Sequence, residues 1–245
     1  MSFINNNFLT LLQWQFLRMK PILPLYFIIQ MLLAIGIVIG FSYLMPNIDE
    51  ITALYLTTGA PTVILLAVGL VFLPQGVAEM KTDGTFNYML SLPLPRLYYV
   101  FVEALIWLLL TIPGIIIALI VASIKFDIQL SYSFKSFFTF IVIGLTAIGI
   151  GYTIALWLKP VVAELISQVL IFAILLFSPV NFPSERLPEW LSKVHDFLPL
   201  QYMAEIIRSA LAPDHFTTET THGIIVLVWC IISFVLCYFA ITKRA

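Results

Sequence analysis

Charged residues are scarce in this sequence of 245 residues, of which Asp, Glu, Lys and Arg make up 10% and apolar residues 61%. A soluble domain carries about 25% charged residues, so this chain cannot cover a soluble surface. Its formal net charge is −1 and it has no basic patch, which excludes a nucleic-acid partner. The composition, with a mean hydropathy of +1.05, is that of an integral membrane protein.

Cysteines are rare and catalytic motifs are absent. Cys230 and Cys237 are seven residues apart in one apolar run, about 10 Å along a helix and too far for a disulfide. The sequence has no Gly-Lys pair, hence no P-loop, and no H-E-x-x-H or G-x-S-x-G motif. The spacing of His195, His215 and His222 does not support a metal site. We predict no catalytic residue, no metal and no cofactor bound by this chain itself.

Long apolar runs dominate the rest of the chain. A helix needs about 20 apolar residues to cross the hydrocarbon core, and helices satisfy their own backbone hydrogen bonds in lipid. The runs lack the alternation of barrel strands. We therefore expect an all-α integral membrane protein, a single membrane domain over residues 1–245. Its six predicted spans are Pro21–Met45, Thr52–Leu73, Leu97–Ser123, Phe134–Leu158, Val161–Phe177 and Gly223–Ile241.

Lys and Arg near the span ends indicate the orientation. With six spans both termini share a side, which holds seven basic residues against five on the other. The seven crowd the span ends, whereas three of the five fall in the long segment between the last two spans. We therefore predict a multi-pass protein of a bacterial cell membrane with both termini in the cytoplasm.

Residues 1–20 do not form a secretory signal, because Arg18 and Lys20 follow the apolar stretch instead of preceding it. Apolar residues recur there at spacings of three and four, which predicts an amphipathic helix along the cytoplasmic interface. This helix either takes part in function or only anchors the chain. Its apolar positions are Ile4, Phe8, Leu11, Leu12, Phe16 and Met19.

Polar groups inside spans are candidate functional residues. Glu164 and Gln168 are four apart near the start of the fifth span and share a helix face. They are possible path-lining residues, or Glu164 is an interfacial carboxylate that reaches water or pairs with Lys159. Glu103 in the third span has the same two interpretations. The central turns of all six spans lack such groups, which argues against an ion-coupled transporter.

Helix packing residues are also suggested by the sequence. Pro24, Pro61 and Pro113 are candidate kinks, which membrane helices tolerate. Small residues let helices approach closely, and the fourth span contains three glycines that either do so or face lipid. They are Gly144, Gly149 and Gly151.

The cytoplasmic loop 74–96, "PQGVAEMKTDGTFNYMLSLPLPR", has a distinct pattern. Glu79 and Lys81 are expected to cap the second span, and Asp83 and Gly84 to form a turn. Thr85 can then cap a short helix, which "PLPR" ends. Its apolar face is predicted to consist of Phe86, Met89, Leu90 and Leu92. Such a helix can transmit force from a cytoplasmic partner, or it is interfacial without one.

The outer segment 178–222 is too apolar for an ordinary loop and too charged to span a bilayer. Pro179, Pro183, Pro188 and Pro199 divide it. Two amphipathic helices too short to span are predicted, Leu187–Leu198 and Gln201–Leu211. The aromatic rings of Phe182 and Trp190 suit the headgroup level.

In order and placement, these features resemble the membrane permease subunits of type-2 ABC transporters over the whole chain. The loop carries the pattern "E…GT…L.SLP..R" and the outer segment "FP…LPEWL……LPLQYMAEIIR". The resemblance implies that the loop forms a coupling helix for a separate ATPase subunit. It implies that the outer segment is an extracellular re-entrant helical hairpin that helps close the exit. With 245 residues, the chain has no room for a large extracellular domain between the first two spans.

The site residues that follow from the resemblance fall into two sets. The ATPase-coupling set is Glu79, Gly84, Thr85, Phe86, Met89, Leu90, Pro93 and Arg96. The outer-gate set is Pro179, Phe182, Pro183, Leu187, Pro188, Trp190 and Pro199.

The expected function is the permease of an ATP-driven exporter for an amphipathic or hydrophobic substrate, such as a peptide, a drug or a lipid-linked compound. The implied partners are two ABC ATPase subunits, which bind ATP and Mg, a second permease copy or a sister permease, and membrane lipids. The alternatives are a non-transporting membrane partner, such as an immunity or sensor protein, and a membrane enzyme without ATP coupling.

Overall fold

The computed structural model describes residues 2–44 and 48–243, and this part of the chain is helical, with no strand. Six of its helical stretches are long and apolar enough to cross a membrane, as the sequence predicts. They run Leu23–Leu44, Glu50–Thr82, Arg96–Phe126, Phe134–Trp157, Pro160–Phe177 and Thr220–Thr242. The end of the first predicted span, Met45, lies outside the described residues.

The second span is the centre of the bundle. It consists of α4 (Glu50–Ala67), a π-helical turn η2 (Val68–Phe72) and α5 (Leu73–Thr82). In its most apolar window 94% of the residues are buried inside the protein, against 17% for the fifth span. α4 packs against α2 (Leu23–Ile35), α7 (Arg96–Phe126) and α11 (Pro199–Leu211), while η2 and α5 pack against α8 (Phe134–Trp157) and α9 (Pro160–Phe177). This helix therefore meets protein, not lipid, on nearly every side.

The predicted loop 74–96 starts too early, because the second span occupies its first nine residues. The helix continues nine residues past the predicted end at Leu73, because the wide turn before Pro74 takes up the register change that a proline demands. There the Leu73 amide donates to the carbonyl of Val68, five residues back. What remains is a turn at residues 83–84, the short helix α6 (Thr85–Ser91) and residues 92–95.

The three glycines of α8 lie at helix contacts. A Cβ on Gly151 would fall 1.8 Å from the carbonyl oxygen of Gly69, and one on Gly149 would fall 2.3 Å from the hydroxyl of Ser233. A Cβ on Gly144 would meet the side chain of Leu108 at 2.6 Å. Close packing through these glycines is confirmed, and the lipid-facing alternative is wrong.

The prolines affect their helices differently. Pro24 is in the first turn of α2, where a missing amide costs nothing, so the predicted kink there is wrong. Pro61 and Pro113 lie inside α4 and α7, and both helices continue through them. Next to Pro113, the side-chain amide of Gln30 on α2 donates to the Leu110 carbonyl at 2.8 Å. The carbonyl that Pro113 frees is that of Leu109, four residues back, so the Gln30 hydrogen bond is an added one to the next carbonyl along the helix.

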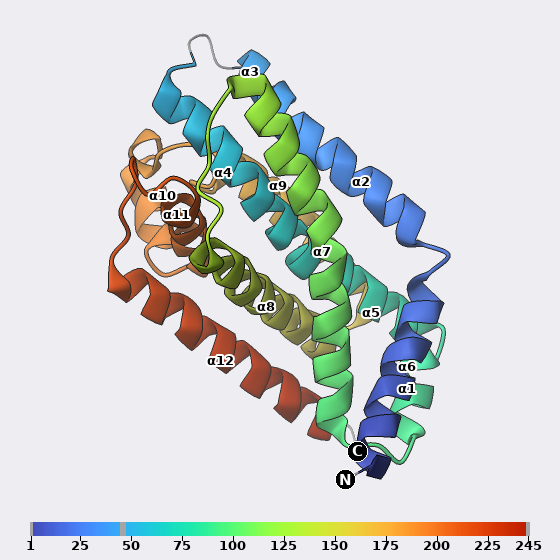
Figure 1. The fold of residues 1–245 in the computed structure, drawn as a ribbon. Helices are drawn as coiled ribbons and strands as arrows, with labels where there is room; N and C mark the ends of the chain where they lie inside the picture. The colour runs from blue at the N-terminus through green and yellow to red at the C-terminus, as the bar shows by residue number, and fades with distance from the viewer. Residues whose placement is uncertain (1, 45–47, 244–245) are drawn as a thin grey trace.

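The N-terminal helix α1 (Ser2–Met19) lies beside α6 and against the start of α7, as Figure 1 shows. Leu11 and Met19 of the predicted apolar face are buried in the bundle, whereas Phe16 of the same face is 51% exposed and its polar neighbour Gln15 is buried. Gln15 turns inward because its side-chain amide donates to the carboxylate of Glu103 on α7. The side chain of Ile4 is outside the described set.

The outer segment begins after α9 and contains a 3-10 turn η3 (Ser184–Arg186), α10 (Glu189–His195) and α11 before α12 (Thr220–Thr242). Pro188 directly precedes α10 and Pro199 lies in the first turn of α11, so these prolines divide the segment as predicted. α10 starts two residues later than predicted and ends three residues earlier, at His195 instead of Leu198. α11 starts two residues earlier than predicted and ends at Leu211 as predicted. α11 packs against α4, α8 and α12.

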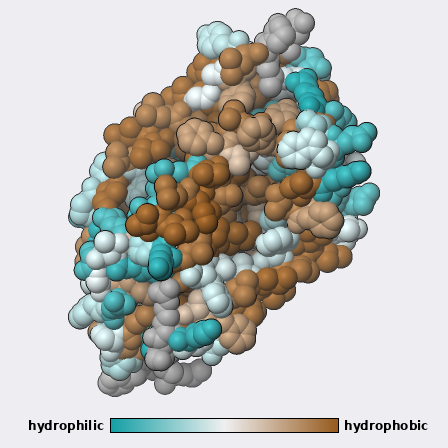
Figure 2. Space-filling view, turned by 180° about the vertical axis from the view of Figure 1, so that it is seen from behind, coloured by the Kyte–Doolittle hydropathy of each residue, from teal (hydrophilic) through white to brown (hydrophobic). Residues whose placement is uncertain are grey.

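The molecular surface is apolar over broad areas. Seen from behind, brown residues fill most of the view and hydrophilic residues gather toward its flanks (Figure 2). The exposed apolar side chains include Val161, Leu165, Val169, Phe172 and Leu176 along α9. A helical bundle with this surface is a multi-pass membrane protein.

Candidate functional site

The first candidate site is the short helix α6 at one end of the central span. Gly84 precedes it with φ +83°, a left-handed conformation that glycine adopts at no steric cost. The carboxylate of Asp83 accepts the backbone amide of Thr85 at 2.8 Å. Asp83, not Thr85, therefore supplies the side-chain cap, and this hydrogen bond lowers the pKa of Asp83.

The two faces of α6 differ in exposure. Phe86 and Met89 are buried, at 3% and 4% exposed, and hold the helix to the bundle. Asn87 and Tyr88 point to the outside, and the Tyr88 side chain is 60% exposed. Contact with another protein at this helix would therefore fall on Asn87 and Tyr88, two residues that sequence reasoning did not include.

Lys81 connects α6 to the turn between α8 and α9. Its ammonium donates to the carbonyls of Leu156 and Leu158, both at 3.2 Å, and also to that of Ala155. It lies 5.8 Å from the centre of the Phe86 ring. A cation at a helix C-terminus is stabilised by the helix dipole. Lys81 thus caps α8, and the expectation that it caps the second span is wrong.

The remaining residues of the predicted coupling set surround this helix. Glu79 is exposed on the last turns of α5, Leu90 is half-buried, Pro93 is exposed, and Arg96 is the half-buried first residue of α7. A shallow cavity of about 270 Å³ lies next to α6. It is bordered by Lys81, by Asn87 and by the turn between α8 and α9.

The second candidate site is the outer segment, which closely approaches α4. A Cβ on Gly59 would come within 2.3 Å of the Asn181 side-chain oxygen and 2.8 Å of the Val180 carbonyl oxygen. Only a residue without a side chain lets residues 180–181 lie directly on the α4 backbone. Asn181 is fully buried, and its two amide atoms have no protein partner within the described part of the chain.

Arg208 on α11 occupies the space beside this contact. Its guanidinium carbon lies 3.8 Å from the centre of the Tyr55 ring and 5.5 Å from that of Phe216. One terminal nitrogen donates to the Val180 carbonyl at 2.9 Å. Arg208 is 3% exposed, and this burial lowers its pKa to about 10, so it is charged at neutral pH.

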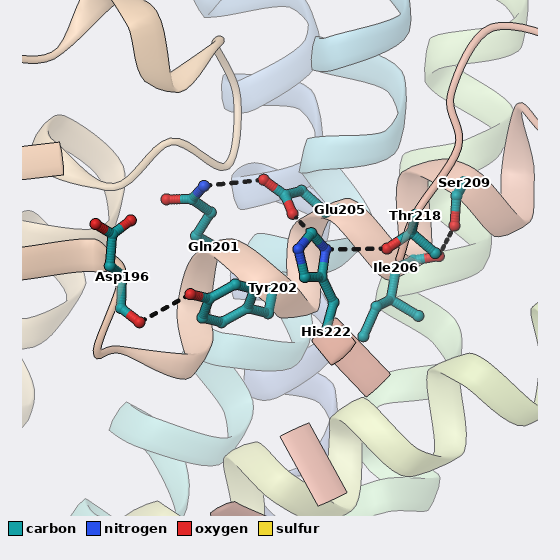
Figure 3. A network of polar contacts seen from close by, with 8 residues as sticks. All are labelled: Asp196, Gln201, Tyr202, Glu205, Ile206, Ser209, Thr218 and His222. Atoms are coloured by element: carbon teal, nitrogen blue, oxygen red, sulfur yellow. Dashed lines mark hydrogen bonds and ion pairs between the residues drawn. The ribbon is translucent and has the colours of Figure 1, made fainter. Parts of the chain in front are cut away.

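A polar network links α11 to the start of α12. The imidazole of His222 lies 2.9 Å from the carboxylate of Glu205 and 3.1 Å from the hydroxyl of Thr218, and Figure 3 shows it between the two. The Gln201 amide donates to the other Glu205 oxygen at 2.9 Å. The Tyr202 ring is 4.9 Å from that of His222. Of the two Glu205 oxygens, only Oε1 accepts a hydrogen bond within the described residues, and Oε2 is the one that faces His222.

The predicted outer-gate residues divide by burial. Pro179 and Pro199 are buried, and Phe182, Pro183 and Leu187 are half-buried. Pro188 and Trp190 are exposed, with Trp190 at 67%. His195 on α10 is buried and its Nε2 lies 2.9 Å from the Phe177 carbonyl, which joins α10 to the end of α9. Burial lowers the pKa of His195.

The polar residues inside spans are placed apart from these two sites. Glu164 is half-buried and Gln168 exposed, on the outward face of α9. Glu103 is 3% exposed and bound to Gln15, so it does not reach water. Among the described residues, no group of three or more His, Cys, Asp and Glu is arranged to hold a metal ion.

Sequence reasoning missed several of the residues that define these contacts. Gln15 and Gln30 act through partners that are 88 and 80 residues away in the sequence, whereas Glu205 accepts from Gln201, four residues before it. Arg208 ends the outer-segment pattern that carries the family resemblance, but its burial against Tyr55 could not be predicted. A polar residue within an otherwise apolar run, such as Gln30, was the one signal available.

The chain matches the model of a known protein family. The family model described as ABC-2 type transporter matches residues 6–212. The match covers α2 to α11 and most of α1, including both candidate sites apart from the stretch that contains Phe216 and His222. No curated protein matches the chain.

Proposed function

The chain belongs to the ABC-2 type transporter family, and we propose that it is the permease of an ATP-driven exporter whose ATPase is a separate subunit. The family match and the six apolar helices make the chain a membrane-spanning permease subunit of an ABC transporter. Such permease domains transport and do not themselves catalyse. ATP and Mg are accordingly expected on the partner ATPase.

The observation that carries the ATPase coupling is the construction of α6. It is a separate short helix at the end of the most buried span, and its inner face is anchored by Phe86 and Met89. Its outer face presents Asn87 and Tyr88. A push on that face is transmitted directly to α5 and, through Lys81, to the turn between α8 and α9. A docked ATPase supplies such a push.

A complete path needs a partner permease, either a second copy or a sister chain, with two ATPase subunits below. The outward face of α9 supports this, because it combines Glu164 and Gln168 with a row of exposed apolar residues. Paired across such faces, two chains would enclose these polar groups. The outer segment, as a re-entrant hairpin, would close the exit.

The substrate class proposed is amphipathic or hydrophobic: a peptide, a drug or a lipid-linked compound. Its support is the small outer segment and the apolar helix surfaces, which offer no soluble binding domain. The substrate class can be tested by measuring the efflux of a panel of such compounds from cells that express the permease with its ATPase. Efflux of none of them, with the ATPase bound, favours a non-transporting sensor or immunity protein.

The test of coupling compares two exposed tyrosines. Tyr88→Ala removes the outward ring of α6, and Tyr132→Ala removes a ring that is 67% exposed in the non-helical stretch before α8. We expect Tyr88→Ala to reduce co-purification of the ATPase encoded with the permease at least about tenfold, as interface aromatics do. Tyr132→Ala should leave it unchanged. Equal ATPase recovery in both variants refutes α6 as the docking helix.

The orientation has its own test. Single cysteines at Lys81 and Glu189, in a background without the two native cysteines, lie at the α5 end and on α10. With cytoplasmic termini, a membrane-impermeant thiol reagent added to intact cells should label the Glu189→Cys variant, and the Lys81→Cys variant only after lysis. Labelling of both in intact cells contradicts the six-span arrangement.

A further inference from the structure

A cavity of about 160 Å³ opens beside Arg208 in the outer segment. It lies where α4, η3, α11 and the stretch before α12 converge. Three of its residues carry charge and two present aromatic rings. The lining residues that matter here are Tyr55, Ser184, Glu185, Glu205, Arg208 and Phe216.

Arg208 is a buried cation without a matching anion. Within the described residues no carboxylate oxygen lies within 4.0 Å of its nitrogens. One nitrogen is used by the Val180 carbonyl, and Nε has no partner in that part of the chain. A buried charge without a paired anion destabilises the fold, whereas a neutral side chain of similar shape would fill the space without that penalty. The charge itself therefore requires an explanation beyond packing.

The two carboxylates of the cavity narrow the ligand class. Glu205 accepts the Gln201 amide through Oε1, and its Oε2 lies 2.9 Å from the Nδ1 of His222 but accepts no hydrogen bond within the described residues. Glu185 is exposed at the rim and takes part in no ion pair within the described set. A bare anion would approach Arg208 past the negative charge of Glu185, and a bare cation would meet Arg208. A ligand that carries both charges a few atoms apart matches both residues.

We propose that this cavity binds a zwitterionic group, with its phosphate or carboxylate on Arg208 and its ammonium beside Glu185. The Arg208 guanidinium offers the anion a fixed planar set of donors, held in place by the Tyr55 ring on one side. The cavity has room for about five water molecules at roughly 30 Å³ each, which suits a headgroup such as phosphoethanolamine. The same chemistry occurs on a lipid and in a free small molecule.

Thermal unfolding of the purified permease in detergent distinguishes the two sources. The probes are dioctanoyl phosphatidylethanolamine, free phosphoethanolamine, and dioctanoyl phosphatidylglycerol, which carries the phosphate without the amine. At about one hundred times its Kd, a probe bound to the native state should raise Tm by about 5–10 °C. A rise with the ethanolamine lipid alone assigns the site to a headgroup. A rise with free phosphoethanolamine as well assigns it to the zwitterion itself.

Two charge pairs provide matched controls in the same segment. Arg208→Gln and Glu185→Gln should each weaken binding at least about tenfold, whereas the exposed neighbours Arg186→Gln and Glu189→Gln should not change it. Glu185 is exposed, so its variant remains informative if Arg208→Gln fails to fold. The proposal is overturned if both lipids act equally, if no ethanolamine probe raises Tm, or if Glu185→Gln binds like the native chain. None of these readouts involves the ATPase, so they stand apart from the coupling proposal.

Discussion

The contact between Gly151 on α8 and Gly69 in η2 allows a prediction whose size follows from the structure. An alanine at position 151 places its Cβ 1.8 Å from the Gly69 carbonyl oxygen and 2.9 Å from its carbonyl carbon. Real Cβ atoms essentially never come within 3.0 Å of a non-bonded atom. The two backbones must therefore separate by at least 1.2 Å, from 1.8 to 3.0 Å. No flexible side chain is there to move instead.

The cost of this separation exceeds the gain in helix propensity. Overpacking a tight contact costs about 3 kcal/mol at the upper end of the usual range, and moving atoms apart by about 1 Å forfeits up to half of their dispersion energy. Alanine returns about 1 kcal/mol relative to glycine within a helix. A net loss of about 2 kcal/mol lowers Tm by about 4–8 °C in a chain of this size.

Thermal unfolding in detergent, followed by tryptophan fluorescence, measures Gly151→Ala against Gly36→Ala. Gly36 is also helical, but a Cβ there has no heavy atom within 4 Å, so this variant should keep or slightly raise Tm. Equal Tm values for the two variants refute the close approach of α8 and η2. A decrease limited to Gly151→Ala supports it.

Two further predictions concern single polar residues. Burial lowers the pKa of His195 below 6.5, so the unfolded state binds more protons than the folded state at acid pH. The contribution of His195 to stability is therefore complete above pH 6.5 and is lost as the pH falls through the lowered pKa of the folded state. Amide exchange in α10, corrected for intrinsic rates, should accelerate between pH 7.5 and pH 5.5, which are about one unit either side of the unfolded pKa, and His195→Gln should abolish this change. Gln30→Leu removes the donor that the Gln30 side chain supplies to the Leu110 carbonyl. The loss of about 1 kcal/mol of stability should lower Tm by about 2–4 °C, whereas the same change at the exposed Gln13 should not lower Tm.

The spans could be predicted from the sequence because hydropathy alone identifies a segment that crosses a bilayer. Their bounds were accurate wherever polar residues or proline end both the apolar run and the helix, as at Phe134 and Phe177. The third span ends three residues later than predicted and the sixth begins three residues earlier, and the second span is the largest exception. Its apolar run stops near Leu73 but its helix continues to Thr82, since the π turn before Pro74 preserves the helix.

Contacts between distant polar residues could not be predicted, because no local pattern records them. The apolar spacing of α1 grouped Phe16 with Leu11 and Met19 on one face, yet Gln15 is buried in place of Phe16 because it binds Glu103, which is 88 residues away. The same holds for Lys81, whose acceptors are about 75 residues further along the chain, at the end of α8. The turn chemistry at Gly84, in contrast, was legible from the dipeptide Asp83-Gly84 itself.

One helix joins the two candidate sites. The second span begins at Glu50, carries Tyr55 and Gly59 against the outer segment, and ends at Thr82 immediately before α6. Because it is buried along nearly its whole length, it cannot move without repacking its neighbours, and packed interfaces switch between discrete arrangements instead of yielding gradually. We therefore expect a displacement applied at α6 to reach Gly59, and Tyr55 beside Arg208, as a rigid shift. Lys81 also contacts the end of α8, whose Gly151 meets the same central span at Gly69.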